Sequence, residues 1–280
     1  MFGMPMWWGN SHVPPPAQHR NPQNTQASRV VDRTGALAFL LALFMLTNHI
    51  QIAGGYTSAA GGLEQDLLKG LAFFNWIGVL VYAVSSSVII AFDYPDRSMQ
   101  LWLTRGVSRP ALLFARLIVI LFFGLLMVCF AIVAILGLGA LSRLLFFGVV
   151  DTSNLNLAAL LPVMLRVFWS SIPYFALTVL FAVISRSPLF AAGGTIVYGS
   201  VLEALATRLS GRFPALVQYL PAQLSKMLQT HNAFLDRTAQ PLPFDAAIMP
   251  EQRAILLIGV IFVLLSVASF AIFSRQDLGG

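Results

Sequence analysis

The run LIVILFFGLLMVCFAIVAILGLGAL, residues 117–141, contains no charged side chain. A helix needs about 20 apolar residues to cross the roughly 30 Å hydrocarbon core of a bilayer, and this run is long enough to do so. Five further stretches come close to that length, at residues 34–53, 71–92, 167–184, 189–206 and 254–273, and Glu203 is the one formally charged side chain in all six. The pattern predicts six transmembrane helices.

The composition of the whole chain agrees with this prediction. The 280 residues are 58% hydrophobic and 10% charged, with a mean hydropathy of +0.78, whereas about 25% of the residues of an average soluble domain are charged. Barrel strands would alternate polar and apolar residues, and these stretches do not. The sequence therefore predicts an all-α integral membrane protein, with a six-helix domain at 34–280 and a proline-rich, disordered tail at 1–33.

Basic residues predict the orientation, because they are enriched in cytoplasmic loops. Six spans place both termini on one side, and arginines crowd the N-terminal tail and the connection between the second and third spans. The long connection at 207–253 is also basic, so the assignment depends on the short loops. No cleavable signal peptide is expected, since the first basic residue is Arg20. We expect a multi-pass protein of the plasma (bacterial inner) membrane with both termini in the cytoplasm.

Several kinds of chemistry lack a motif. A P-loop needs a Gly-Lys-Ser/Thr end that reaches phosphates, and Lys69 and Lys226 are both in other contexts. The histidines are scattered and form no zinc motif. The sequence therefore predicts no catalytic residue, no metal site, no cofactor held by this chain and no nucleic-acid partner.

The segment DYPDRSMQLWLTRGVSRPALLFAR, residues 93–116, separates the second and third spans and carries four arginines. Leu101, Trp102 and Leu103 offer apolar contact, while Asp93 and Arg109 can pair with opposite charges on a partner. The alternative is a helix held at the surface by anionic lipid. Because the segment also contains acids, which such lipid repels, we favour a docking surface for a protein.

The fifth span carries the candidate intramembrane site. Ala191, Thr195 and Gly199 recur every four residues, so they are expected to line one helix face that another helix approaches closely. Glu203 falls one turn further on. A carboxylate in an apolar span usually faces a cavity or the bundle interior, which makes Glu203 a candidate pathway residue. The alternative is that it reaches outer water or pairs with Arg166 or Arg208.

Apolar residues also recur at helical spacing between 213 and 228, with an interruption at Pro221. This pattern predicts a broken, interfacial or re-entrant helical segment on the outer side. Tyr219 and Pro221 are therefore candidates for an outer gate. A plain interfacial anchor is the alternative interpretation.

The segment after the second span resembles its counterpart in permease subunits of exporter-type (type-2) ATP-binding-cassette transporters. In that family an acidic residue opens a cytoplasmic amphipathic helix, a Gly-Thr-like pair follows, and a Pro-Val-Ser-Arg-like end leads to an alanine and a basic residue. The matching positions here are Asp93, Tyr94, Ser98, 103–105, Val107, Ser108, Arg109, Ala115 and Arg116. Two positions depart from the pattern, because Arg97 replaces the usual glycine and Gly106 the usual proline. Weaker similarities at 185–188, 219–221 and 273–278 extend the resemblance from about residue 32 to the C-terminus.

The resemblance implies a permease subunit that moves a substrate outward by alternating access. Two six-helix permease chains would meet on a central pathway, as a homodimer by default or as a heterodimer. Each would press a cytoplasmic coupling helix onto a separate ATPase subunit, which binds ATP and Mg. The coupling residues implied here are Asp93, Tyr94, Arg97, Leu101, Trp102, Leu103, Arg105, Ser108 and Arg109.

Two alternative functions remain open from the sequence. An ion-coupled secondary carrier would place ionisable or broken-helix sites near the midplane, often in repeated halves, and neither feature is visible. A non-transporting membrane anchor or assembly factor would bind partners without moving any substrate.

Overall fold

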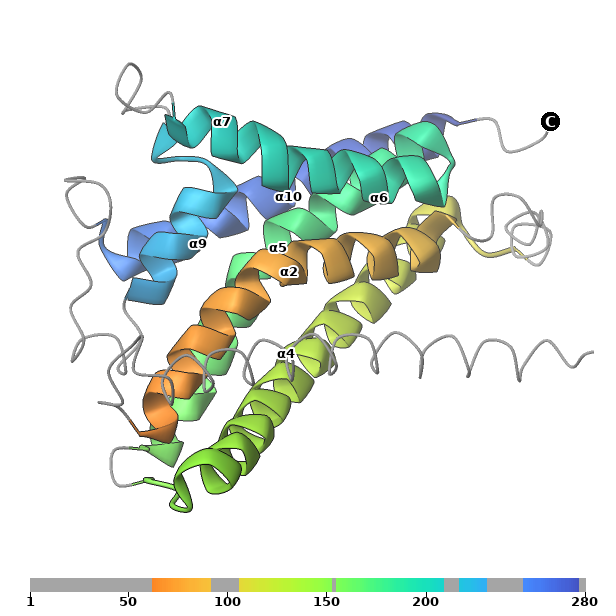
Figure 1. The fold of residues 1–280 in the computed structure, drawn as a ribbon. Coiled ribbons are helices and arrows are strands. Elements are labelled where there is room, and N and C mark those ends of the chain that lie inside the picture. The colour runs from red at the N-terminus through yellow and green to blue at the C-terminus, as the bar shows by residue number, and fades with distance from the viewer. Residues whose placement is uncertain (1–61, 92–105, 153–154, 209–216, 231–248, 277–280) are drawn as a thin grey trace, which may run out of the picture. The chain divides into compact units, whose positions relative to one another are not determined.

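The computed structural model describes residues 62–91, 106–152, 155–208, 217–230 and 249–276, all within one compact unit of the chain (Figure 1). These residues form helices and no strand. The first predicted span, at 34–53, and most of the predicted coupling helix lie outside the described residues. The all-helical fold class is confirmed for the part of the chain that the structure describes.

The helices follow one another along the chain with short connections. They are α2 (Leu63–Ala91), α4 (Arg109–Phe147), the short η1 (Leu157–Ala159), α5 (Leu160–Ser185), α6 (Pro188–Ile196), the π-helical η2 (Val197–Leu202), α7 (Glu203–Arg208), α9 (Pro221–Thr230) and α10 (Glu251–Arg275).

Four of these helical stretches are long and apolar enough to cross a membrane: Arg109–Phe147, Leu157–Ser185, Pro188–Ala206 and Glu251–Arg275. They contain four of the six predicted spans. Within α2, which contains the predicted span at 71–92, the apolar stretch is shorter and covers Ile77–Ile90. The described residues therefore support a membrane protein with at least four candidate spans.

The helices continue well beyond the apolar runs that predicted them. α4 begins after Ser108, whose extended backbone precedes a proline in the first turn, and ends where Gly148 adopts φ 70° and donates its N–H to the Leu144 carbonyl. Arg143 therefore lies inside α4, although the sequence placed it in a connection. Arg166 likewise lies inside α5. Backbone hydrogen bonding continues a helix past its apolar stretch until a capping residue ends it.

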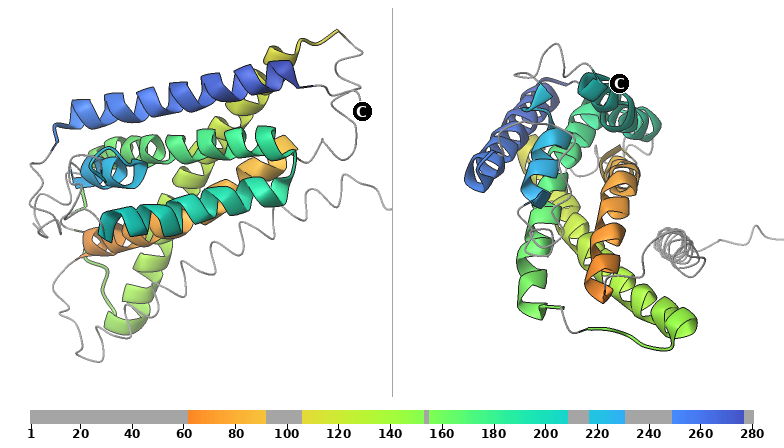
Figure 2. Two further views of the ribbon diagram at one scale, coloured as in Figure 1. Left: turned by 90° about the horizontal axis from the view of Figure 1, so that it is seen from above. Right: turned by 60° about the vertical axis from the view of Figure 1, so that its left-hand side comes forward.

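α5 is the centre of the bundle. It contacts α2, α4, α6, α9 and α10, and it is the most buried of the four long helices (Figure 2). Its neighbours turn large apolar side chains outward, for example Val133 of α4, Leu189 of α6 and Leu264 of α10, each more than 60% exposed. Outward apolar faces on a packed bundle are what a lipid environment permits.

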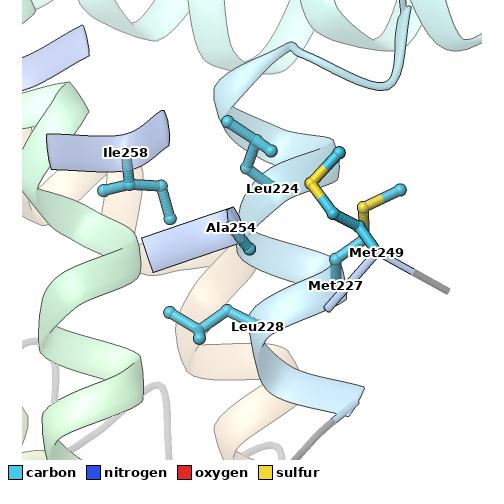
Figure 3. Close-up of a cluster of buried hydrophobic side chains, with 6 residues drawn as sticks. All are labelled: Leu224, Met227, Leu228, Met249, Ala254 and Ile258. Carbon is cyan, nitrogen blue, oxygen red and sulfur yellow. The ribbon is translucent and has the colours of Figure 1, made fainter. Parts of the chain in front are cut away.

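The short helix α9 packs against α10. Its side chains Leu224, Met227 and Leu228 are buried together with Met249, Ala254 and Ile258 (Figure 3). A second contact joins α9 to α5, since the Ser225 hydroxyl donates to the Ser170 carbonyl at 3.0 Å. The outer segment predicted from the sequence is thus a helix that starts at Pro221 and is docked on two longer helices.

Candidate functional site

The predicted docking segment is described only at its C-terminal end. Asp93, Tyr94, Arg97, Leu101, Trp102, Leu103 and Arg105 lie outside the described residues. Gly106, with φ 83°, is followed by Ser108, the exposed residue that caps α4, and by Arg109, the first residue of that helix. The segment therefore leads directly into the N-terminus of α4.

Arg109 ties the start of α4 to two other helix ends. Its guanidinium donates to the backbone carbonyl of Gln276, the residue that follows α10. The Gln276 side-chain amide in turn donates to the Val183 carbonyl, near the end of α5, at 2.6 Å. The start of α4 and the ends of α5 and α10 are thus connected by a chain of hydrogen bonds.

Arg116, two turns further along α4, binds the other side of the docking segment. Its guanidinium donates to the carbonyls of Ile89 and Ile90 at 3.0 and 2.9 Å. The last carbonyls of a helix have no partner within that helix, and a cation is favourable there. We call Arg109, Arg116 and Gln276, with the carbonyls of Val183, Ile89 and Ile90, the Arg109 junction. It holds both ends of the 92–108 segment on one helix.

We expect Arg116→Met to lower the free energy of unfolding by about 1.5–3 kcal/mol, because two helix-end carbonyls lose a charged donor. Arg208→Met is the matched control, since Arg208 is exposed and most surface substitutions change stability by about 0.5 kcal/mol or less. Unfolding midpoints of the purified variants in the same detergent test this expectation. Equal midpoints for the two variants would contradict it.

Glu203 is buried, with 2% of its surface exposed. One carboxylate oxygen accepts a hydrogen bond from the Tyr174 hydroxyl of α5 at 2.7 Å, and the other accepts from the Ala222 N–H of α9 at 3.2 Å. Tyr198 also hydrogen-bonds this carboxylate, and Lys226 interacts with it electrostatically. The carboxylate thus joins three helical segments that are distant in sequence.

The expected alternative pairing of Glu203 with Arg166 is wrong. Arg166 instead forms a bidentate ion pair with Glu251 at the start of α10, with N–O distances of 2.7 and 3.1 Å. The expectation that Glu203 reaches outer water is also wrong, because α9 covers it. Sequence spacing placed Glu203 near the span boundary correctly but could not show the covering helix.

The small-residue face of the fifth span packs inward. Ala191 and Thr195 are fully buried, and the Thr195 hydroxyl lies 3.0 Å from that of Thr178 on α5. A β-carbon on Gly199 would come within 2.9 Å of Val79 and 3.3 Å of Tyr174. Close approach to α5 and α2 therefore depends on these small residues.

The two other outer-gate candidates occupy different environments. Pro221 is buried at the start of α9, where a proline costs no helix hydrogen bond. Tyr219 is 40% exposed, and Arg253 donates to its hydroxyl at 3.5 Å. The structure does not bring Tyr219 into the hydrogen bonds made by Glu203 that are described above.

Sequence reasoning missed Tyr174, Tyr198 and Gln276. Tyr174 had a detectable signal, because it recurs with Ser170 and Thr178 at four-residue spacing inside an apolar span. The π-helix at Val197–Leu202, which immediately precedes Glu203, had no such signal. π-Helical turns inside helices often occur at functional sites.

No protein-family model matches the chain, and no curated protein matches it significantly. Among the described residues, no group of three or more His, Cys, Asp or Glu side chains could hold a metal ion. The chemistry of the described polar residues is therefore hydrogen bonding between helices.

Proposed function

We propose that this chain is the transmembrane permease subunit of an exporter-type ATP-binding-cassette transporter. It moves a substrate across the plasma membrane by alternating access, driven by ATP hydrolysis on a separate subunit. Its six spans are 34–53, α2, α4, α5, α6 through α7, and α10, with residues 93–108 as a cytoplasmic coupling segment. α9 is the outer re-entrant helix.

The observation that carries this proposal is the Arg109 junction. A force applied to the 92–108 segment would act on Arg109 and Arg116 of α4, and through their hydrogen bonds on the ends of α2, α5 and α10. A coupling segment needs such a connection, because a partner's conformational change must bias the whole bundle between two states. A simple surface anchor has no such need.

The remaining parts of the assembly follow from this role. ATP and Mg bind to the partner ATPase. The outward apolar faces of α4, α6 and α10 contact lipid and a second permease chain, which is an identical copy by default because closed twofold symmetry is the commonest arrangement. Both termini and the Arg109 junction lie on the cytoplasmic side.

Co-purification from the native membrane tests the proposal. A C-terminally tagged chain is purified and its partners are identified by mass spectrometry, for the wild type and for the combined Asp93, Trp102 and Arg109 replacement with alanine. We expect a stoichiometric ATPase with the wild type and a loss of at least about ten-fold with the variant, since hot-spot residues each contribute about 2 kcal/mol or more.

Two further variants make the result interpretable. Asp93→Ala with Trp102→Ala leaves the Arg109 junction intact, so a loss of ATPase in this variant reports docking and not a disturbed bundle. Arg208→Ala serves as the control at the opposite end of the sixth predicted span's neighbour, α7, and should retain the ATPase. An intact protein that brings no ATPase in any sample would overturn the proposal, and transport by the purified chain under an ion gradient would establish a secondary carrier instead.

A further inference from the structure

The carboxylate of Glu203 completes the N-terminus of a helix to which it is not covalently adjacent. Pro221 begins α9 and has no N–H, so Ala222 supplies the first N–H of that helix. The N–H groups of a first helical turn have no partner within the helix and favour a negative charge. Glu203 provides that charge at 3.2 Å.

The same carboxylate is fixed from the other side by the centre of the bundle. Tyr174, only 6% exposed, donates its hydroxyl to Glu203 at 2.7 Å. Tyr174 is in turn held close to the π-helical segment, because Gly199 leaves room for its ring. One carboxylate thus connects α5, the η2–α7 segment and α9.

Burial makes this connection strong but conditional. A carboxylate taken out of water is tolerated only while donors satisfy it, and leaving it unpaired is costly. When α9 is docked, Tyr174, Tyr198 and Ala222 supply those donors. When α9 leaves, the Ala222 donor is lost, and water must take its place. The docked and undocked positions are therefore two distinct states.

We propose that Glu203, Tyr174 and the Ala222 N–H form a latch that holds α9 closed over the outer end of the bundle, and that transport requires its opening. We call these three groups the Glu203 latch. The gating role rests on the proposed function, whereas the holding of α9 by the latch does not. Glu203 is thereby a positioning residue for the outer gate and not a ligand for substrate in the closed state.

Hydrogen–deuterium exchange of the α9 amides, followed by mass spectrometry on protein in lipid nanodiscs, tests the holding role. Glu203→Ala is expected to speed exchange in residues 222–228 by about ten-fold or more, because a hydrogen bond to a buried charge is lost. Tyr174→Phe removes only the hydroxyl and should give a smaller increase confined to the same residues. Glu203→Gln keeps an oxygen acceptor for Ala222 and should lie closer to wild type than Glu203→Ala.

Tyr82→Phe is the matched control. Tyr82 is another buried span tyrosine, and its ring packs edge-on against Phe175, one residue from Tyr174. Its loss should leave α9 exchange unchanged. Unchanged α9 exchange in Glu203→Ala and Tyr174→Phe would overturn the latch, as would an equal increase across α5 and α10, which would indicate a general loss of packing.

The gating role is tested on the complex with its ATPase. Adding ATP and Mg should increase α9 exchange in the wild type, and in Glu203→Ala the increase should be smaller because α9 is already released. Nucleotide-independent α9 exchange in a coupled complex would overturn gating. If no ATPase co-purifies, the proposed function fails, yet the exchange results for the latch variants still stand, so the two failures are distinguishable.

Discussion

Replacing Asp66 by alanine is expected to lower the free energy of unfolding by about 3–5 kcal/mol, the cost of leaving one member of a buried ion pair without its partner. Asp66, in the first turn of α2, forms a bidentate pair with Arg143, near the end of α4. Their side chains are 1% and 9% exposed, so water cannot replace the lost carboxylate. Unfolding of the purified protein in detergent, followed by circular dichroism, measures the loss.

Two companion variants separate the charge from the packing. Asp66→Leu combined with Arg143→Met removes both charges and should recover most of the lost stability, since an apolar pair often equals a buried ion pair. Glu251→Gln weakens the more exposed pair with Arg166, whose side chains are 19% and 32% exposed, and should cost about 1 kcal/mol or less. A loss in Asp66→Ala as small as that in Glu251→Gln would contradict the prediction.

Gly124→Ala is expected to destabilise the bundle by about 1–3 kcal/mol through overpacking. A β-carbon at this position of α4 would lie 2.3 Å from the ring of Phe175, which is completely buried in α5. The ring has no free space to move into, so α4 and α5 must separate. The shift in the unfolding midpoint relative to wild type measures this effect.

Gly137→Ala is the matched control on the same helix. A β-carbon at Gly137 meets no atom within 4 Å, and alanine is favoured over glycine within a helix by about 1 kcal/mol. This variant should therefore be neutral or stabilising. Combining Gly124→Ala with Phe175→Leu should recover part of the loss, because the two side chains compete for one space. If Gly124→Ala and Gly137→Ala behaved alike, close packing of α4 on α5 would not be limiting.

Much of the fold could be predicted because apolar length is a local property. A run such as 117–141 can satisfy its backbone in lipid only as a helix, wherever its neighbours lie. The small-residue periodicity at Ala191, Thr195 and Gly199 likewise indicated a close-packed face from spacing alone. Helix ends were predicted less well, because α4 continues from Arg109 to Phe147 on backbone hydrogen bonds that hydropathy does not register.

The candidate site was only partly predictable. A lone carboxylate in an apolar span drew attention to Glu203, and clustered arginines drew attention to Arg109. Neither pattern could identify Tyr174, Ala222 or Gln276 as partners, since these residues lie 19 to 167 positions away.

The sequence by itself determined that this chain is a helical membrane protein, where most of its described spans run and which polar residues stand out in them. Only the tertiary structure decided that Glu203 holds α9, that Asp66 pairs with Arg143 and that Arg109 and Arg116 join the ends of four helices. The physical reason is that the cost of placing a polar group in an apolar span is fixed locally, whereas the partner that offsets this cost is chosen by how the helices cross.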